Sequence, residues 1–493
     1  MLLIRSYYSF ISISVITLFF LMSRVCAQTI SADTIILEQI HIIDVNTGKI
    51  KRNRTVEIHS GFITAIKKYK KKNYGNNSLV IEARGRYLIP GLWDMHVHIS
   101  QGPWYNPEKT FALMIANGIT GIREMGGNLN VLKRWKEQVR NGALIGPRMI
   151  IAGPILYGDR NIGVTYLAVP SSAAARHIVD SLKSGGVDFI KVYNFIEREQ
   201  YFAIADEAKK QKLPFAGHVP WSISLIEASD AGQSSIEHLN FPFFAEECAK
   251  EATRFRQMDI SKIFQFSRPF DRNSIPAFLE QLHYLDSALQ QFDQKKADTI
   301  YDHFAANHTW QCPTLIYLKT SVNIRDSILK KDPLMKYVYY SRVQHDWDYK
   351  NIPVVAGMSE LEYRILQRLY EKNLKIVSDM KKKNISFLAG TDLINPFIYP
   401  GFSLHQELQL FVERGFTALE ALQTATTNPA VFLGLEDSLG SISEGKYADL
   451  IMLDANPLKD IHNTQRIEAV IVQGKYYNRK QLDKLLESVA EKK

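Results

Sequence analysis

The chain has 493 residues, of which 46% are apolar and 23% are charged, and it carries a formal net charge of +9. A chain of this length and apolar content can bury one large core or two smaller ones, which excludes an intrinsically disordered protein. The basic excess lies in runs such as "KKYKKKN" (67–73) and "MKKKN" (380–384). These runs lack the interleaved aromatic residues of a nucleic-acid binder, so we expect solvated loops and no nucleic-acid partner.

The N-terminal segment has the features of an export signal. Arg5 precedes the apolar run "FISISVITLFFLM" (10–22), and Val25 and Ala27 occupy the small-residue positions of a cleavage site. We expect cleavage after Ala27 and a mature protein that is periplasmic or secreted, with no stable membrane span after processing. The run is shorter than the roughly 20 apolar residues of a membrane span, which makes a retained anchor the weaker interpretation. Cys26 leaves a lipid-anchored form open.

Both ends of the mature chain predict short strands. Residues 28–88 contain apolar stretches separated by Thr-Gly, Ser-Gly and Arg-Gly pairs, which are typical of turns between strands. Residues 435–493 have the same character, with "GSISEGKYADLIMLDANP" (440–457) followed by "RIEAVIVQGKYY" (466–477). We expect the two ends to build one small β-sandwich domain together.

The central region, 89–432, alternates short apolar strands with helix-like stretches, a pattern that favours a parallel α/β fold. The predicted strands are 92–99, 118–125, 148–153, 188–193, 214–219, 234–239, 312–318 and 386–393. Eight strands are the number in a (β/α)8 TIM barrel. Helices are predicted at 171–186, with a Ser cap and a terminal Gly pair, and at 199–212. The stretch of about 240–311 is too long for a crossover, so we expect an insertion with its own helices.

Polar side chains gather at the C-terminal ends of these strands, where a barrel carries its active site. They are His96, His98, Lys191, His218, His238 and Asp392. His96 and His98 share one face of a strand because side chains alternate. Each residue alone has a simple structural explanation, but six at one rim would be costly to bury without partners. A metal supplies the partner, and imidazole with carboxylate suits zinc or a similar cation. Five such ligands exceed one tetrahedral site, which indicates two ions, and Lys191 beside them must be neutral or converted to an anion.

The order of these residues, HxH, Lys, His, His, Asp, resembles the amidohydrolase superfamily of metal-dependent hydrolases. The flanking text is similar to its imidazolonepropionase-like, Xaa-Pro dipeptidase-like branch, and includes "YLIPGLWDMHVHI", "GITGIREMGG", "AGHV", "SIEHL", "LAGTD", "ATTNPA" and "GSISEGKYADLIMLD". The resemblance covers nearly the whole mature chain. The segments 240–311 and 319–384 are the weakest part of it. After the export signal (1–27), we therefore expect a barrel (89–432) between the two parts (28–88 and 435–493) of the small β domain.

The resemblance implies a role for each residue of the site. His96, His98 and Asp392 would bind the more buried metal ion, and His218 and His238 the second. Lys191 would be carboxylated and bridge two divalent ions, with Zn²⁺ the expected metal. Mononuclear members exist in the family, so a single ion stays open. Asp392 would also be the catalytic residue that takes a proton from the nucleophile and passes it to the leaving nitrogen.

The implied function is that of an exported amidohydrolase, a hydrolase acting on carbon–nitrogen bonds. A metal-bound hydroxide would attack an amide or peptide bond in a small substrate such as a dipeptide or an N-acyl amino acid. One alternative is a hydrolase of cyclic amides, lactones or phosphoesters on the same site. Another is a non-catalytic binding protein on a retained barrel.

Other contacts of the site are open at this stage. Tyr193, Asn240 and Arg123 are candidates for substrate binding, although Arg123 has a structural ion pair as its alternative. Cys248 and Cys312 could pair in an oxidising compartment. A homo-oligomer is also left open.

Overall fold

The computed structural model describes residues 33–75, 77–101, 106–158, 164–250, 275–338, 343–393 and 395–490. The predicted export signal, with its cleavage site after Ala27 and the lipid-anchor alternative at Cys26, lies outside these residues. Within the described ranges, none of the helices combines the length and the apolar character that a membrane span requires.

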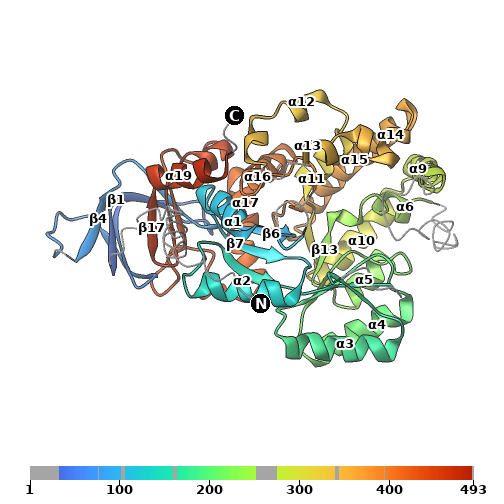
Figure 1. The fold of residues 1–493 in the computed structure, drawn as a ribbon, viewed down its shortest axis with the longest axis horizontal. Coiled ribbons are helices and arrows are strands. Elements are labelled where there is room, and N and C mark those ends of the chain that lie inside the picture. The colour runs from blue at the N-terminus through green and yellow to red at the C-terminus, as the bar shows by residue number, and fades with distance from the viewer. Residues whose placement is uncertain are drawn as a thin grey trace, which may run out of the picture.

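Strands from both ends of the chain form one sheet at the left end of the molecule, where the blue β1 and the red β17 lie in the same layer (Figure 1). Its strand order is β17 (Lys475–Asn478), β16 (Ile467–Val472), β15 (Leu450–Leu453), β5 (Tyr87–Pro90), β1 (Thr34–Ile43), β2 (Ile50–His59) and β3 (Phe62–Lys68), with β4 (Ser78–Glu82) beside β1. The two ends meet where β5 pairs antiparallel with β15, Leu88 opposite Met452. Both residues belong to one apolar cluster, so the two ends share a core.

The central strands are parallel and fall into two sheets. The three-stranded sheet contains β6 (Leu92–Val97), β7 (Ile119–Glu124) and β8 (Arg148–Ile151). The six-stranded sheet has the order β10 (Tyr166–Ala168), β9 (Ile155–Tyr157), β11 (Ile190–Val192), β12 (Phe215–Gly217), β13 (Ser235–Glu237) and β14 (Trp310–Cys312). As assigned, these strands do not make one closed sheet.

Backbone hydrogen bonds nevertheless link the two parallel sheets on both sides. On one side the segment 386–393 lies between them: Met95 N donates to Ala389 O at 2.9 Å, and Leu388 N donates to Gln311 O at 2.9 Å. On the other side Asp188 N donates to Ile151 O at 2.8 Å. The links bring the C-terminal ends of the parallel strands to one region.

The helices are α1 (Pro107–Ala116), α2 (Leu129–Arg140), α3 (Ser172–Gly185), α4 (Arg198–Lys210), α5 (Leu225–Asp230), α6 (Phe244–Glu247), α9 (Ile275–Gln290), α10 (Gln294–Ala306), α11 (Leu315–Val322), α12 (Ser327–Lys330), α13 (Val343–Asp346), α14 (Pro353–Gly357), α15 (Glu360–Lys382), α16 (Phe402–Glu413), α17 (Ala418–Thr424), α18 (Thr427–Phe432) and α19 (Arg479–Val489), with 3-10 turns η2 (His238–Asn240), η4 (Pro333–Tyr337), η5 (Tyr349–Asn351) and η6 (Ile461–Gln465). The predicted helix at 171–186 is α3, capped by the Ser171 side chain and ended by Gly186 in the left-handed conformation. The predicted helix at 199–212 is α4. The described part of the predicted insertion holds α6, α9 and α10.

Two predicted strands need correction. The segment 312–318 is mostly helical, because β14 ends at Cys312 and α11 begins at Leu315. Thr314 has a left-handed backbone, which ends the strand, and the Glu407 carboxylate accepts hydrogen bonds from the first backbone N–H groups of α11. A short apolar run such as "LIYL" does not distinguish strand from helix by its periodicity. The segment 386–393 forms only isolated bridges.

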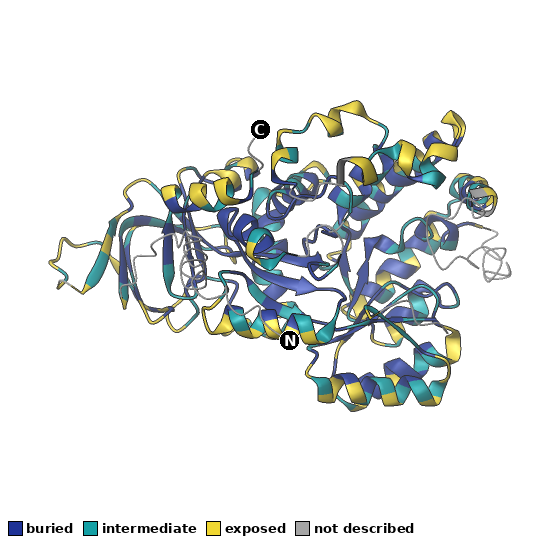
Figure 2. Cartoon of the chain, in the orientation of Figure 1, coloured by how far each residue is buried: buried dark blue, intermediate teal, exposed yellow. Residues whose placement is uncertain are grey.

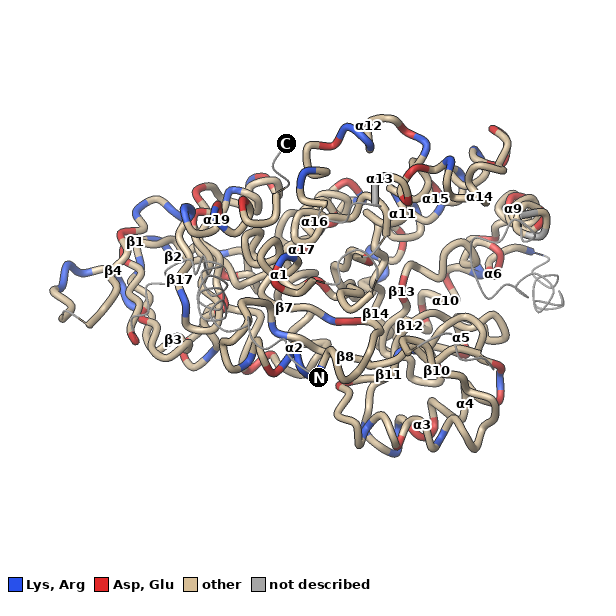
Figure 3. The backbone as a smooth tube through the Cα atoms, in the orientation of Figure 1, with Lys and Arg blue, Asp and Glu red and all other residues tan. Residues whose placement is uncertain are grey.

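Burial and charge follow the same division between centre and surface. β6 and β7 are buried at every position and lie in the dark centre of Figure 2. The lysines of the 67–73 run are exposed, as are Lys382 and Lys383, which agrees with solvated basic runs. Blue and red segments alternate along outer helices such as α3 (Figure 3). Cys248 and Cys312 are both buried and unpaired, so the described chain has no disulfide.

Candidate metal centre

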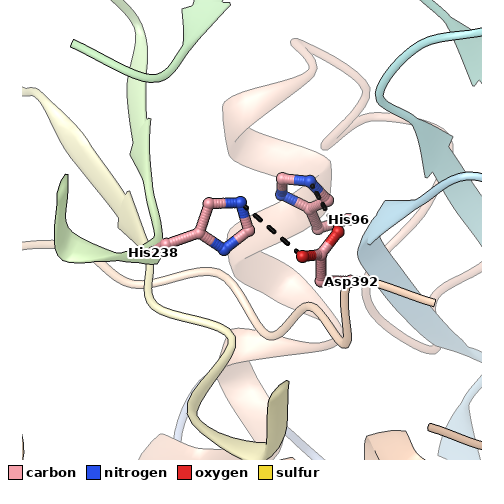
Figure 4. A group of neighbouring side chains, drawn as sticks. All are labelled: His96, His238 and Asp392. Atoms are coloured by element: carbon pink, nitrogen blue, oxygen red, sulfur yellow. Dashed lines mark ion pairs between the residues drawn. The ribbon is translucent and has the colours of Figure 1, made fainter. Parts of the chain in front are cut away.

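The structure brings the six predicted ligands together at the C-terminal ends of the parallel strands. Asp392 lies at their centre. Its Oδ1 is 3.4 Å from Nε2 of His96 and 3.6 Å from Nε2 of His98, and its Oδ2 is 3.9 Å from Nε2 of His238. Figure 4 shows the carboxylate of Asp392 with the rings of His96 and His238 directed toward it. His218 lies next to His238, and the centres of the two rings are 5.0 Å apart.

Lys191 completes the group from β11. Its side chain is buried, and its aliphatic part passes beside Gly217, where a Cβ would come within 3.1 Å of Lys191 Cδ and 2.2 Å of a backbone oxygen. Gly390 is equally confined, because a Cβ there would be 2.8 Å from Cβ of His96. Side chains at either glycine would push these ligands away, which explains glycine in "AGHV" and "LAGTD".

Two of the ligands have a left-handed backbone conformation, which sets the direction of their side chains. His238 has φ 57° and Asp392 has φ 55°, a region that costs energy for residues other than glycine. Tertiary contacts must hold this conformation, because local propensity disfavours it. Strain of this kind is concentrated at functional sites.

Each imidazole is held through its Nδ1 atom by a group beside the site. The contacts are His96 to Glu237 Oε2 at 2.7 Å, His98 to Gly126 O at 3.2 Å, His218 to Asn194 Oδ1 at 2.7 Å and His238 to Thr314 Oγ1 at 2.7 Å. An acceptor at Nδ1 places the ring proton there and leaves the lone pair on Nε2. Metal-binding histidines in proteins are oriented in this way.

Burial keeps these imidazoles neutral. It lowers the pKa of His98 and of His238 to about 3, and the nearby charge of Lys191 acts in the same direction. Burial also lowers the pKa values of His96 and His218 well below the usual value. A neutral imidazole is the form that binds a metal ion, so the rings are prepared as ligands near pH 7.

The pKa values of Lys191 and Asp392 shift in opposite directions. Burial lowers the pKa of Lys191 to about 8, although the carboxylates of Glu237 and Asp392 oppose the change. Burial raises the pKa of Asp392 to about 7, and the charge of Lys191 opposes that change. Burial therefore favours the neutral form of both groups, and perturbed groups of this kind are concentrated at functional sites.

The residues present fit a divalent cation. Among the described residues, Nε2 of His96 and Nζ of Lys191 are buried without a hydrogen-bond partner, which is unusual for polar atoms in a protein interior. His96, His238 and Asp392 offer ligand atoms close enough to share one ion. A second group, His96 with Glu237 and Cys312, is as close, but Arg123 already neutralises Glu237 there. Imidazole and carboxylate are the ligands of zinc sites.

A cavity of about 310 Å³ opens onto these ligands. Its aromatic wall includes Tyr166, Tyr193, Phe241 and Tyr317. Tyr193 packs on His218 with ring centres 4.2 Å apart, so this predicted substrate-binding residue lies in the cavity. The volume falls within the range of pockets for small molecules.

The other two substrate-binding candidates lie elsewhere. Arg123 is fully buried, and its guanidinium donates to Glu237 at 2.9 Å, to Ser235 at 2.9 Å and to the Met95 carbonyl at 2.6 Å. These contacts match the alternative of a structural ion pair and do not leave the side chain for a substrate. Asn240 is half-buried in η2 and is absent from the described lining of the cavity.

The sequence interpretation missed the residues that hold the imidazoles. Glu237 lies near the end of the predicted strand 234–239, next to His238, and Asn194 directly follows the predicted strand 188–193, next to Tyr193. Their polarity at strand ends is a usable signal. Thr314 carries no such signal because it lies in the middle of the predicted strand 312–318. Its role depends on the left-handed turn that precedes α11.

Comparison with known proteins agrees with this geometry. Residues 87–476 match the Amidohydrolase family. Ochratoxinase from Aspergillus niger is 37% identical over 411 residues, which cover 78% of this chain and 73% of that protein. Adenine deaminase 4 from Rhizobium meliloti is 34% identical over 105 residues, 21% of this chain and 16% of that protein.

Solved structures show the same fold. Bottromycin amidohydrolase has a TM-score of 0.70 at 20% identity, with 93% of this chain and 90% of that chain covered. A Xaa-Pro dipeptidase with bound methionine has a TM-score of 0.62 at 20% identity, with 90% and 100% covered. At this identity the likeness concerns the fold. The match to the family over most of the sequence shows that the chain belongs to the amidohydrolase family, as a hydrolase that acts on carbon–nitrogen bonds.

Proposed function

We propose that this protein is an exported, metal-dependent amidohydrolase that cleaves an amide or peptide bond in a small substrate such as a dipeptide or an N-acyl amino acid. The observation that carries the proposal is the position of Asp392 between the imidazoles of His96, His98 and His238, beside a cavity of about 310 Å³. The proposed metal ligands line part of this cavity, so a substrate bound in the cavity would lie beside the metal centre.

In this proposal two divalent ions, expected to be Zn²⁺, are held by the six residues. His96, His98 and Asp392 would hold one ion, and His218 and His238 would hold the other. Such ions would supply an acidified water as nucleophile and a positive charge for the substrate carbonyl. The four imidazoles, whose pKa values burial lowers, and the unpartnered Nε2 of His96 support metal binding at this site.

Lys191 is proposed to bridge the two ions as a carbamate. The neutral amine forms a bond from Nζ to the carbon of CO₂ and loses one proton, which leaves an anionic oxygen pair. Burial supports this step, because it lowers the pKa of Lys191 to about 8 and so increases the neutral fraction near pH 7. An unmodified ammonium beside two cations would be strongly disfavoured.

Asp392 is proposed to move the proton during the reaction. Its carboxylate accepts a proton from the attacking water and delivers it to the nitrogen that leaves when the carbon–nitrogen bond breaks. Burial raises the pKa of Asp392, which makes its carboxylate a better proton acceptor than an exposed one. Asn395 Nδ2 donates to Asp392 Oδ2 at 2.7 Å, which holds the carboxylate in orientation.

The names of the relatives agree with a small amide or peptide substrate. A relative aligned over 411 residues is named ochratoxinase, and two of the structural neighbours are named as a bottromycin amidohydrolase and a Xaa-Pro dipeptidase. The aromatic wall formed by Tyr166, Tyr193, Phe241 and Tyr317 offers apolar contact to such a substrate.

The same proposal includes the architecture and the location. We propose that the parallel strands of 89–432 close as an eight-stranded barrel through the segment 386–393, supported by its hydrogen bonds to Met95 and Gln311. Residues 28–88 and 435–493 are proposed to form the small β domain. Export with cleavage after Ala27 is tested by N-terminal sequencing of the processed protein, which should begin at Gln28.

The central experiment combines metal analysis with a substrate panel. The purified protein is assayed for bound metal per chain and then, loaded with Zn²⁺, against dipeptides and N-acyl amino acids, with cyclic amides, lactones and phosphoesters for comparison. We expect metal to be bound and linear amides to be cleaved fastest. Asp392→Asn is the matched variant, with a similar shape but no proton-accepting carboxylate, and it should be inactive. Metal-free protein with full activity would contradict the proposal.

A further inference from the structure

Three buried side chains from three strands form a continuous chain that ends at a proposed metal ligand. Arg123 comes from β7, Glu237 from β13 and His96 from β6, and each is fully buried. Arg123 Nη2 lies 2.9 Å from Oε1 and 3.0 Å from Oε2 of Glu237, and Oε2 lies 2.7 Å from Nδ1 of His96. The ion pair is thus connected directly to the imidazole.

The carboxylate of Glu237 is held on every side. Ser235 Oγ donates to its Oε1 at 2.5 Å, and the guanidinium that faces it is fixed by donation to the Met95 carbonyl at 2.6 Å. Arg123 and Ser235 donate to its oxygens, so in its contact with His96 this carboxylate is placed as the acceptor of the hydrogen bond. It therefore requires the ring proton of His96 on Nδ1, which leaves the lone pair on Nε2, 3.4 Å from Asp392.

His96 differs in this respect from the other three imidazoles. The Nδ1 atoms of His98, His218 and His238 face a backbone carbonyl, an amide oxygen and a hydroxyl. Among the four imidazoles, His96 is the one whose Nδ1 faces a carboxylate in the described structure. An anionic acceptor makes the imidazole a stronger donor to a metal than a neutral acceptor does.

We propose that Glu237, held by Arg123, is a positioning residue that fixes the Nδ1-protonated tautomer of His96 and strengthens its Nε2 as a ligand of the more buried ion. This proposal rests on the metal site proposed above. It also explains why a buried ion pair lies inside the strand core, where such pairs contribute little to stability compared with apolar residues. Arg123 compensates the charge of Glu237, so that the site gains a carboxylate without an unpaired buried charge.

The test measures metal affinity and the stability of the metal-free protein in the same variants. Glu237→Gln keeps the shape and one acceptor but removes the charge. We expect Zn²⁺ affinity, measured by competition with a chelator, to fall about 10–100-fold. The double variant Glu237→Leu with Arg123→Met removes the acceptor and the cation together, so no unpaired charge is buried. It should recover stability relative to Glu237→Leu alone but keep the weak affinity.

Asp449→Asn is the matched control. Asp449 is a buried carboxylate that pairs with Arg148 at 2.5 Å, at the start of the terminal sheet strand β15. Its loss should lower stability without changing Zn²⁺ affinity. Equal affinity of wild type and Glu237→Gln, with a loss of stability like that of Asp449→Asn, would overturn the positioning role and leave the metal site standing.

The tautomer is read directly in the metal-free protein by ¹⁵N–¹H correlation of the imidazole nitrogens. We expect His96 to be protonated on Nδ1 in the wild type and to lose this preference in the double variant. An Nε2-protonated His96 in the wild type would overturn the proposal. A wild-type protein that binds no Zn²⁺ would instead overturn the proposed function itself, so the two failures are distinguishable.

Discussion

The side-chain oxygen of Asn194 lies 2.7 Å from Nδ1 of His218, so the amide orients this ring and leaves its Nε2 as the ligand atom. We predict that Asn194→Leu, which removes the acceptor, lowers Zn²⁺ affinity about 10–100-fold. Asn194→Asp keeps an acceptor and makes it anionic, so it should bind Zn²⁺ at least as tightly as the wild type. Chelator competition with each variant measures the effect. Equal affinity in Asn194→Leu and wild type would show that the bond does not support metal binding.

Lys191→Ala tests the proposed carbamate bridge. We expect metal content to fall from about two ions per chain toward one or none, and turnover to fall by several orders of magnitude, because a bridging ligand is lost. Added acetate or propionate should restore part of both, since a small carboxylate can replace the carbamate. Lys191→Arg should not be restored, because a guanidinium keeps its charge. Full occupancy and full rate in Lys191→Ala would contradict the bridge.

His405 makes the stability of the fold depend on pH at a place outside the metal centre. Its Nδ1 lies 2.9 Å from Thr464 Oγ1 and its Nε2 3.0 Å from the Asn117 carbonyl, and burial lowers its pKa to about 4. The unfolded chain takes up a proton near pH 6.5, whereas the folded chain does so only near pH 4. The stability from neutral His405 is therefore complete above pH 6.5 and is lost as the pH falls toward 4.

His405→Gln should remove this dependence. The difference in free energy of unfolding between wild type and variant should shrink by about 3 kcal/mol from pH 7 to pH 4, at about 1.4 kcal/mol per pKa unit. Groups common to both proteins cancel in the difference. Denaturant unfolding at several pH values, with a chelator present, gives both curves. Parallel curves over this range would contradict the assignment.

Removal of residues 440–493 should expose the edge of the terminal sheet. The truncation deletes β15, which pairs with β5, and also α19, whose Val489 packs with Leu113 of α1. An open strand edge recruits other chains, so we expect aggregation in place of a monomer. Size-exclusion chromatography of the truncated protein measures this. A soluble monomer would mean that the N-terminal strands are stable without their C-terminal partners.

Much of the fold is readable from local pattern. The capped helix α3 was predicted because Ser171 and Gly186 carry their signals in the sequence itself. The helix α11 was missed because its first turn depends on Glu407, which lies in α16 and is distant in sequence. The start of such a helix cannot be predicted from the apolar run alone, because its capping group belongs to another helix.

The residues of the candidate site can be grouped from the order of the amino acids alone. His96, Lys191, His218, His238 and Asp392 each stand near the end of an apolar segment, and parallel strands present these ends at one edge, so their order along the chain was enough to group them. The groups that hold these side chains in place come from distant parts of the chain and become known only from the fold. Whether Arg123 meets a substrate or Glu237 depends on how β7 of the three-stranded sheet faces β13 of the six-stranded sheet, and the alternation of side chains along each strand contains no information on that arrangement.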